Sequence, residues 1–267
     1  MAPHSDHWER VQKWLADCMP HCLVCLSSAR TLKNGSEREV WDCRLSTDGT
    51  ESTAVLAIFK PGSLESVNTS LPPAQAAQKC ALAMTELPTL GIPTPRVLGH
   101  ATVDGEAAVL CEKIEQTEWR PDVRIEAARI LARLHNLRES DLSVPLQELA
   151  RISDPREYRT TGGQAPQPEA KTLVHGDYFS ANILPVAGGL RIIDWETFGW
   201  GDPMWDLGFL IGADRGLTDN EVEASIAEYE SGAAVDWRRL IWHKRRWSDY
   251  WEQRERQSSN KADAGDA

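Results

Sequence analysis

The stretch LVHGDYFSANILPVAGGLRIIDWE, residues 173–196, contains two apolar, strand-like runs, each followed by an aspartate. Asp177 follows "LVHG", and Asp194 follows "LRII"; Asn182 lies between them, in the first loop. Strand ends present side chains to a cleft, so these three oxygen-bearing groups can meet there. Phosphoryl transfer needs such a set, because an aspartate must orient the attacking hydroxyl while amide and carboxylate oxygens hold Mg²⁺ on the phosphates.

Two other interpretations of this stretch remain open on the residues alone. Asp177 and Asn182 are residue types that favour turns without any chemical role. His175 and Asp177 could instead begin a zinc site, although the sequence places no third nitrogen or sulfur ligand close to them.

The charge of the 267-residue chain bears on its partners. The formal net charge is −11, which argues against nucleic-acid or anionic-membrane partners, since phosphate contacts need clustered Lys and Arg. The same charge suits a cationic small substrate. The polar N-terminus has no apolar segment of a secretory signal, and no run is long enough to span a bilayer. We therefore expect a cytoplasmic protein.

Three of the six cysteines form a C-x3-C-x2-C pattern at Cys18, Cys22 and Cys25. This spacing is typical of iron–sulfur ligation, and with His21 it could indicate zinc. The alternative is a group of small buried thiols where a helix passes into a strand. Because the cysteines surround Pro20 and no second Cys or His group completes a site, we predict buried thiols.

The first part of the chain predicts a small antiparallel sheet with one helix. The runs 36–46 and 53–60 are joined by a turn-forming "TDGT" and predict a hairpin, and 95–103 with 107–114 predicts a second. Residues 74–87 have helical composition and end before Pro88. We therefore expect a β-rich lobe over residues 1–113.

The remainder of the chain predicts a helical lobe over residues 114–255, followed by a disordered tail at 256–267. Its predicted helices comprise 123–137, a segment from Asp202, a capped helix from Thr218, and 235–255. In the last helix a stripe of tryptophans at helical spacing predicts packing; its members are Trp237, Trp242, Trp247 and Trp251.

Several segments together resemble the aminoglycoside phosphotransferase/choline kinase family, which has a protein-kinase-like fold. The segments are "HGDYFSANIL" (175–184), "IIDWE" (192–196), "GWGDPMWDLGFL" (199–210), "ILARLHNL" (130–137) and "GIPTPRVLGH" (91–100). The resemblance runs from about residue 30 to 255 and implies an α+β, two-lobed enzyme. The implied activity is transfer of a phosphoryl group from a nucleoside triphosphate to an alcohol.

The resemblance also implies roles for individual residues. Asp177 matches the catalytic base, and Asn182 and Asp194 match the Mg²⁺ ligands. His175 matches a residue that supports the catalytic loop, and Asp206 is expected to pin that loop. Asp202 is expected to cap a helix, and His135 is expected to pack at a helix end.

The predicted nucleotide site departs from the family pattern. Lys60 is the candidate for the phosphate-binding lysine, but Ala57 could occupy the usual basic position, and the two face opposite sides of a strand. The helix glutamate that should pair with the lysine is missing, since Glu86 lies late in 74–87. The remaining predicted nucleotide contacts are Gly35 and Ser36 in a short glycine loop, and backbone groups of Glu112 to Ile114 at the hinge.

These observations predict a kinase of a small hydroxyl compound that uses Mg²⁺ and either ATP or GTP. An aminoglycoside-type cationic antibiotic is the leading substrate, with a metabolic alcohol or a macrolide as the alternative. Acidic candidates for contact with substrate amino groups are Glu115, Glu118, Asp122 and Glu196. A catalytically silent binding protein on the same scaffold is the alternative from another class.

Overall fold

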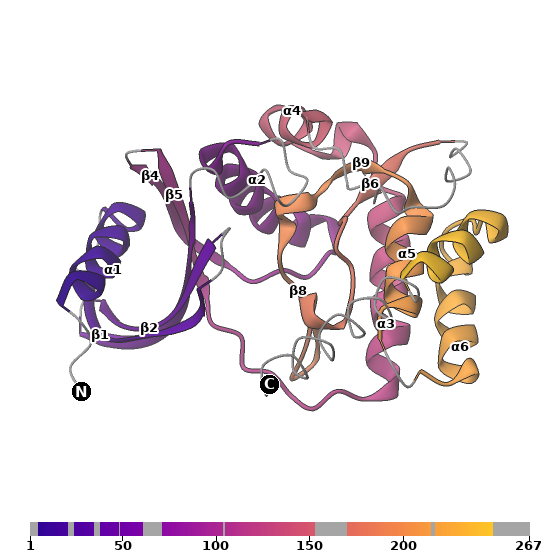
Figure 1. Ribbon diagram of the computed structural model, residues 1–267, viewed down its shortest axis with the longest axis horizontal. Coiled ribbons are helices and arrows are strands. Elements are labelled where there is room, and N and C mark those ends of the chain that lie inside the picture. Colours follow the sequence, from indigo (N-terminus) through magenta and orange to yellow (C-terminus); the bar gives the residue numbers. More distant parts are fainter. Residues whose placement is uncertain are drawn as a thin grey trace, which may run out of the picture.

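The sheet of the first lobe has five antiparallel strands in the order β1-β2-β3-β5-β4. The computed structural model describes residues 5–20, 24–34, 38–47, 49–60, 71–103, 105–152, 170–214 and 217–247. The strands are β1 (Val24–Asn34), β2 (Arg38–Thr47), β3 (Thr50–Phe59), β4 (Val97–Val103) and β5 (Glu106–Glu112). Both predicted hairpins are present, and β1 adds an outer strand to them (Figure 1).

The two faces of this sheet pack against different helices. On β3, Ala54, Leu56 and Ile58 belong to the core cluster that contains α1 (Ser5–Cys18). Ala57 and Phe59 point to the other face, toward the cluster that contains α2 (Pro73–Glu86). The alternation follows from the two-residue period of a strand, and it decides which side each polar residue of β2 and β3 can reach.

The second lobe combines helices with two short strand pairs (Figure 1). The helices are α3 (Pro121–His135), α4 (Val144–Ile152), α5 (Pro203–Gly212) and α6 (Asp219–Glu230), with a further helical segment at 237–247. The strand pairs are β6 (Thr172–Val174) with β9 (Gly199–Gly201), and β7 (Ile183–Val186) with β8 (Gly189–Ile192). Its short 3-10 turns are η2 (Glu139–Asp141), η3 (Ser180–Asn182) and η4 (Trp195–Thr197); a further one, η1 (Leu87–Leu90), follows α2 in the first lobe.

The stretch 173–196, which carries Asp177, Asn182 and Asp194, contributes to the largest core cluster. Tyr178, Trp195 and Phe198 are fully buried there, in the same cluster as α2 and α3. The loop residues are therefore anchored by apolar neighbours from both lobes. β5 ends at Glu112 and α3 begins at Pro121; the division into domains at residue 113 stays a prediction, and the tail at 256–267 lies outside the described residues.

Helix ends in the second lobe follow the predicted capping chemistry. Asp202 caps α5, since its Oδ1 accepts a hydrogen bond from the Met204 N–H at 2.9 Å. Thr218 and Glu221 form a capping box at the start of α6. Both predicted caps are confirmed.

The predicted tryptophan stripe is only partly a packing surface. Trp247 is buried and stacks on Phe209 with ring centroids 3.5 Å apart. Trp237 is 49% exposed, so the prediction is wrong for that residue. The helical segment turns this end of the stripe toward solvent, and Trp251 lies outside the described residues.

Candidate active site

A buried carboxylate holds the turn that carries Asp177. Asp206, at the first turn of α5, is fully buried. Its Oδ2 accepts a hydrogen bond from the His175 N–H at 2.6 Å, and its Oδ1 accepts one from the Gly176 N–H at 2.9 Å. Trp205 Nε1–H also donates to the Gly176 carbonyl at 2.9 Å. These bonds from α5 set the path of the backbone directly before Asp177.

His175 supports the same turn from the other side. Its Nε2–H donates to the Ile193 carbonyl at 2.9 Å, and its Nδ1 accepts from the Asp177 N–H at 3.2 Å. Burial lowers the pKa of His175 below its ordinary value, against the opposing charge of Asp206. The neutral ring is the form that can donate on one nitrogen and accept on the other. It therefore ties the Asp177 loop to Ile193, which lies between the end of β8 and Asp194.

Gly176 has a conformational reason to be glycine. Its φ is +86°, and a Cβ placed there would lie 2.9 Å from backbone and side-chain atoms of Thr197. The Thr197 hydroxyl donates to the His175 carbonyl at 2.7 Å, so this close approach is part of the hydrogen-bonded turn.

Asp177 and Asn182 are joined directly. Asn182 Nδ2 donates to Asp177 Oδ2 at 2.8 Å and to the Asp177 carbonyl at 2.9 Å. The amide nitrogen of buried Asn182 is thus used within the loop, so Oδ1 is the atom of this side chain that could face a metal ion. The Ile193 N–H donates to the Asn182 carbonyl at 3.0 Å, which brings the residue before Asp194 against the same loop.

Asp194 adopts an unusual backbone conformation. Among the described residues it is the one non-glycine residue with positive φ, at 73°. Such a conformation costs energy and concentrates at functional sites. The hard oxygen donors of Asn182 and Asp194 suit Mg²⁺, which completes its shell with phosphates and water. No group of three or more His, Cys, Asp or Glu arranged to hold a metal occurs in the described part of the chain.

Arg38, at the start of β2, lies against Asp194. Its Nη1 donates to Asp194 Oδ1 at 2.6 Å and to Glu196 Oε2 at 2.9 Å, and its Nη2 donates to Asp194 Oδ2. Burial alone would lower the pKa of Arg38, but the charges of Asp194 and Glu196 outweigh it and raise that pKa well above its ordinary value. The Asp194 carboxylate therefore already binds a cation in this structure.

Comparison with known proteins bears on this arrangement. Residues 118–243, which include Asp177, Asn182 and Asp194, match the model described as the phosphotransferase enzyme family, APH. Over this segment the chain is similar to that family. The predicted resemblance and the predicted enzyme class, a phosphotransferase, are confirmed. A search of curated proteins gave no match.

Solved structures similar to this phosphotransferase have its fold at low identity. An aminoglycoside-3'-phosphotransferase of type VIII is 19% identical, with a TM-score of 0.57, covering 90% of this chain and 98% of that one. The macrolide 2'-phosphotransferase of Brachybacterium faecium is 16% identical, with a TM-score of 0.60 and coverage of 86% and 85%. An amicoumacin kinase bound to AMP-PNP and Ca²⁺ is 12% identical, with a TM-score of 0.57 and coverage of 85% and 78%. The predicted kinase-like, two-lobed α+β fold is confirmed.

The structure does not bring Lys60 to the other predicted site residues of the phosphotransferase. Lys60 Nζ lies 3.0 Å from Glu39 Oε1, and Glu39 also pairs with Arg10 of α1. Burial alone would raise the pKa of Glu39, but the hydrogen bond from Lys60 and the charge of Arg10 lower it. Lys60 therefore lies on the α1 side of the sheet, which argues against its predicted phosphate role.

Glu86, the glutamate near the end of α2, also makes its contacts elsewhere. Glu86, at the end of α2, accepts hydrogen bonds from the Ser143 N–H at 2.9 Å and the Ser143 hydroxyl at 2.5 Å. Earlier in the same helix, Lys79 is fully buried, and its Nζ donates to the Phe198 carbonyl at 2.9 Å. α2 therefore directs a lysine side chain toward the segment after Asp194.

Replacing Lys79 with methionine is expected to change how stability depends on pH. Burial lowers the pKa of Lys79 to about 7, from 10.5. The unfolded chain therefore binds the extra proton between about pH 7 and 10.5, and folding becomes more favourable as pH rises through that range. The unfolding free energy of the wild type minus that of Lys79→Met should increase with pH there, by at most about 1.4 kcal/mol per unit. Urea titrations from pH 6 to 10 measure it, with the exposed Lys171→Met as control; a flat difference contradicts the prediction.

The predicted hinge contacts are partly used within the sheet. The Glu112 N–H donates to the Arg96 carbonyl at 2.9 Å, and the Lys113 N–H donates to the Thr53 carbonyl at 3.3 Å. The prediction that Ile114 faces the nucleotide base stays a prediction. Gly35 and Ser36 lie outside the described residues.

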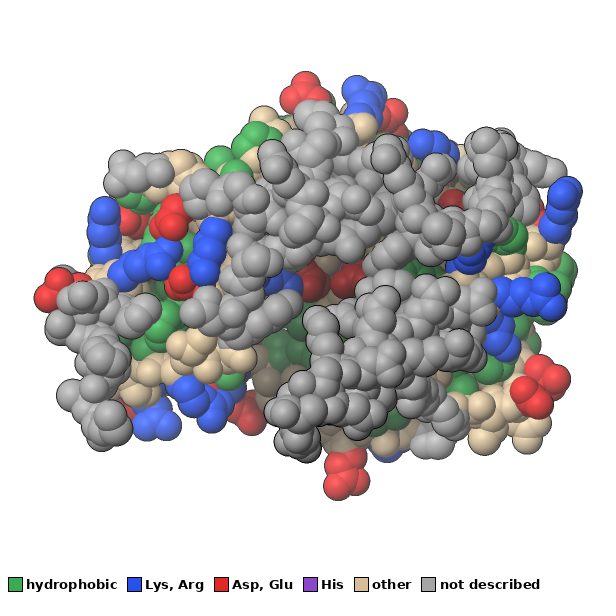
Figure 2. All heavy atoms as spheres, viewed as in Figure 1, with side chains coloured by type: hydrophobic (Ala, Val, Ile, Leu, Met, Phe, Trp, Pro, Cys, Tyr) green, Lys and Arg blue, Asp and Glu red, His purple; other side chains and the backbone are tan. Residues whose placement is uncertain are grey.

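The predicted substrate-binding acids fall into two groups. Glu115, Glu118 and Asp122 are exposed, and Asp122 lies 3.3 Å from Arg120. Glu196 is instead buried against Arg38, so its carboxylate is directed at that guanidinium. Figure 2 shows acidic and basic side chains interspersed over one face of the molecule. A cationic substrate would meet both signs of charge there.

Three of the described cysteines, Cys18, Cys43 and Cys80, are buried thiols. Cys18 and Cys43 are buried, and burial raises the pKa of each thiol to about 12. The predicted burial is therefore confirmed for Cys18. The other members of the C-x3-C-x2-C pattern, Cys22 and Cys25, have no described side chains.

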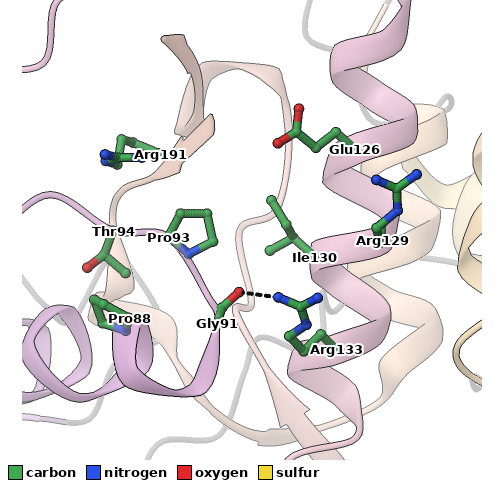
Figure 3. Close-up of a pocket in the computed structure, with 9 residues that line it drawn as sticks. All are labelled: Pro88, Gly91, Pro93, Thr94, Glu126, Arg129, Ile130, Arg133 and Arg191. Atoms are coloured by element: carbon green, nitrogen blue, oxygen red, sulfur yellow. Dashed lines mark hydrogen bonds between the residues drawn. The ribbon is translucent and has the colours of Figure 1, made fainter. Parts of the chain in front are cut away.

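A pocket of ≈ 480 Å³ lies between α3 and the segment after α2, and none of the predicted site residues lines it (Figure 3). Its lining includes Glu126, Arg129, Arg133 and Arg191. Arg133 Nη1 donates to the Gly91 carbonyl at 2.8 Å, and Arg129 pairs with Glu228 at 2.6 Å. The pocket contains none of the predicted catalytic residues, and two of its arginines are engaged within the protein.

No helix in the described part of the chain combines the length and apolar character needed to cross a membrane.

Proposed function

We propose that this phosphotransferase moves the γ-phosphoryl group of ATP or GTP to a hydroxyl of a small molecule. The observation that carries the proposal is the direct bond between Asp177 and Asn182, at 2.8 Å, on a turn held by buried Asp206. The family match over 118–243 supports the same reaction class. Phosphoryl transfer requires a base for the attacking hydroxyl and an oxygen ligand for the metal ion, and both can be held in one loop.

Each residue of the loop has a distinct part in this reaction. Asp177 orients the attacking hydroxyl and receives its proton as the bond to phosphorus forms. Asn182 Oδ1 and the Asp194 carboxylate would hold Mg²⁺, which when bound offsets charge on the phosphates. His175 and Asp206 touch no reacting atom and position the loop through backbone hydrogen bonds.

The substrate is proposed to be a cationic hydroxyl compound of the aminoglycoside type. The net charge of −11 and the exposed Glu115 and Glu118, just after β5, support attraction of amino groups. Two structures with this fold hold aminoglycoside-type compounds, streptomycin in one and hygromycin B in the other. A macrolide or a metabolic alcohol (choline, homoserine or a sugar) is the alternative acceptor.

A second candidate function is a binding protein without transferase activity. The specific observation in its favour is that the guanidinium of Arg38 bonds both carboxylate oxygens of Asp194, the predicted metal ligand. The presence of Ala57 at the position of β3 that could have carried the phosphate lysine also favours this candidate. Mg²⁺-dependent phosphoryl transfer by the purified chain would exclude this candidate.

The experiment that tests the proposed function is a phosphate-transfer screen. ATP and GTP are each supplied with Mg²⁺ and with aminoglycosides, macrolides, amicoumacin, choline, homoserine or sugars. We expect phosphorylation of at least one amino-bearing compound at a hydroxyl, detected as a mass increase of one phosphate. Transfer only to neutral compounds contradicts the cationic substrate, and the absence of transfer to any acceptor contradicts the reaction class.

A further inference from the structure

We propose that Arg38, which pairs with Asp194, is the phosphate-binding cation of the nucleotide site. This inference rests on the proposed function. It assigns to β2 a role that the sequence led us to expect from Lys60, after β3. It also assigns Glu196 as the partner that keeps Arg38 in place.

The register of the sheet places Arg38 on the correct face. In the β2–β3 pair Arg38 lies opposite Phe59, and Val40 lies opposite Ala57. Directly opposed residues of an antiparallel pair project to the same face. Arg38 therefore shares the α2-side face with Ala57, the position that could have carried the phosphate lysine. Lys60 lies on the other side with Glu39.

The contacts of Arg38 leave the local charge unbalanced. One guanidinium faces two carboxylates, and the side chains of Arg38, Asp194 and Glu196 are 15%, 13% and 10% exposed. The three groups together carry a net charge of about −1 when ionised. A cation at Asp194 would be attracted to this remaining charge, and the low exposure strengthens that attraction.

Exchange of partners follows from this geometry. With Mg²⁺ held by Asp194 and Asn182, the Arg38 guanidinium would be repelled from the Asp194 carboxylate that it now contacts. Glu196, bonded to Nη1 at 2.9 Å, retains Arg38 close by. The released N–H groups can then bind nucleotide phosphate oxygens, which the planar fork of arginine suits. In the sequence, Arg38 lies two residues after Ser36, one of the predicted phosphate contacts.

Glu196 supplies the acid that α2 does not. Glu86 is engaged by Ser143, and the buried polar residue of α2 nearest the segment after Asp194 is a lysine, which donates to Phe198. The Arg38–Glu196 pair thus replaces a lysine from β3 and a glutamate from α2 with two residues from other elements. The combination retains a cation held by an acid at the phosphates.

The test is Arg38→Met, measured by two binding experiments that need no turnover. The affinity for a fluorescent ATP or GTP analogue, measured in the presence of Mg²⁺, is expected to fall about 10- to 100-fold. This is the usual cost of losing hydrogen bonds to a charged group. Affinity for Mn²⁺ alone, followed by electron paramagnetic resonance, is expected to rise about threefold or more, because Asp194 loses its competing cation. General damage to the fold would weaken both and would overturn the proposal.

Three further variants sharpen the comparison. Arg30→Met removes an arginine that is 74% exposed on neighbouring β1, and neither affinity should change by more than about twofold. Arg38→Lys should recover only part of the nucleotide affinity, because an ammonium cannot bind phosphate through a fork. Lys60→Met should have a smaller effect than Arg38→Met; a larger effect, or unchanged nucleotide affinity in Arg38→Met, overturns the proposal.

The experiments distinguish failure of the proposed function from failure of the phosphate role of Arg38. If the wild type binds nucleotide and transfers phosphate but Arg38→Met binds nucleotide normally, the inference about Arg38 is wrong and the proposed function stands. If the wild type shows no nucleotide binding and no transfer, the proposed function and the phosphate role of Arg38 fail together. The Mn²⁺ measurement still tests whether Arg38 competes for Asp194.

Discussion

Asp177→Asn is expected to lower the rate of phosphoryl transfer by about 10²- to 10⁴-fold, the usual contribution of a positioned base. The amide keeps an oxygen that can accept from Asn182 Nδ2, so the loop should retain its shape. It cannot receive the proton of the attacking hydroxyl. Nucleotide affinity should therefore remain within a few-fold of the wild type, and kcat should account for nearly all of the loss.

The measurement is steady-state kinetics with the best acceptor from the transfer screen, together with equilibrium nucleotide binding. Asp219→Asn, an exposed aspartate at the start of α6, is the matched control and should keep its rate. A fully active Asp177→Asn enzyme would contradict the assignment of Asp177 as the base. A large loss of nucleotide affinity would point to a structural role instead.

Asp206→Ala is expected to reduce the free energy of unfolding by about 2–5 kcal/mol. The substitution leaves the N–H groups of His175 and Gly176 without their acceptor in a site that excludes water. It also removes the carboxylate 3.5 Å from His135. Phosphoryl transfer should fall as well, because the backbone before Asp177 is no longer held.

Urea unfolding followed by tryptophan fluorescence measures the stability change. Asp219→Ala provides a control for removing an aspartate from the first turn of a helix. A loss of less than about 1 kcal/mol for Asp206→Ala would contradict the structural role, since even one unsatisfied buried donor costs that much. Asp206→Asn should be more stable than Asp206→Ala but less stable than the wild type. Its one amide oxygen replaces two carboxylate oxygens that now accept from the N–H groups of His175 and Gly176.

Much of the fold could be predicted because its signals are local. The two hairpins, helix α2 and the caps at Asp202 and Thr218 each depend on residues close together in the chain. Helix α4 and strand β9 were not predicted, because they span only nine and three residues. Trp237 was misplaced because spacing alone cannot say which side of a helix finds a partner.

The sequence by itself determined the reaction class of this phosphotransferase. Asp177, Asn182 and Asp194 lie in one short stretch, where spacing and residue type already constrain the chemistry. Only the tertiary structure decided which cation faces that stretch. Strand register turned Lys60 toward Glu39 and brought Arg38, more than 150 residues away in the chain, onto Asp194. A contact between distant residues depends on how the sheet packs against the second lobe, and no local pattern encodes it.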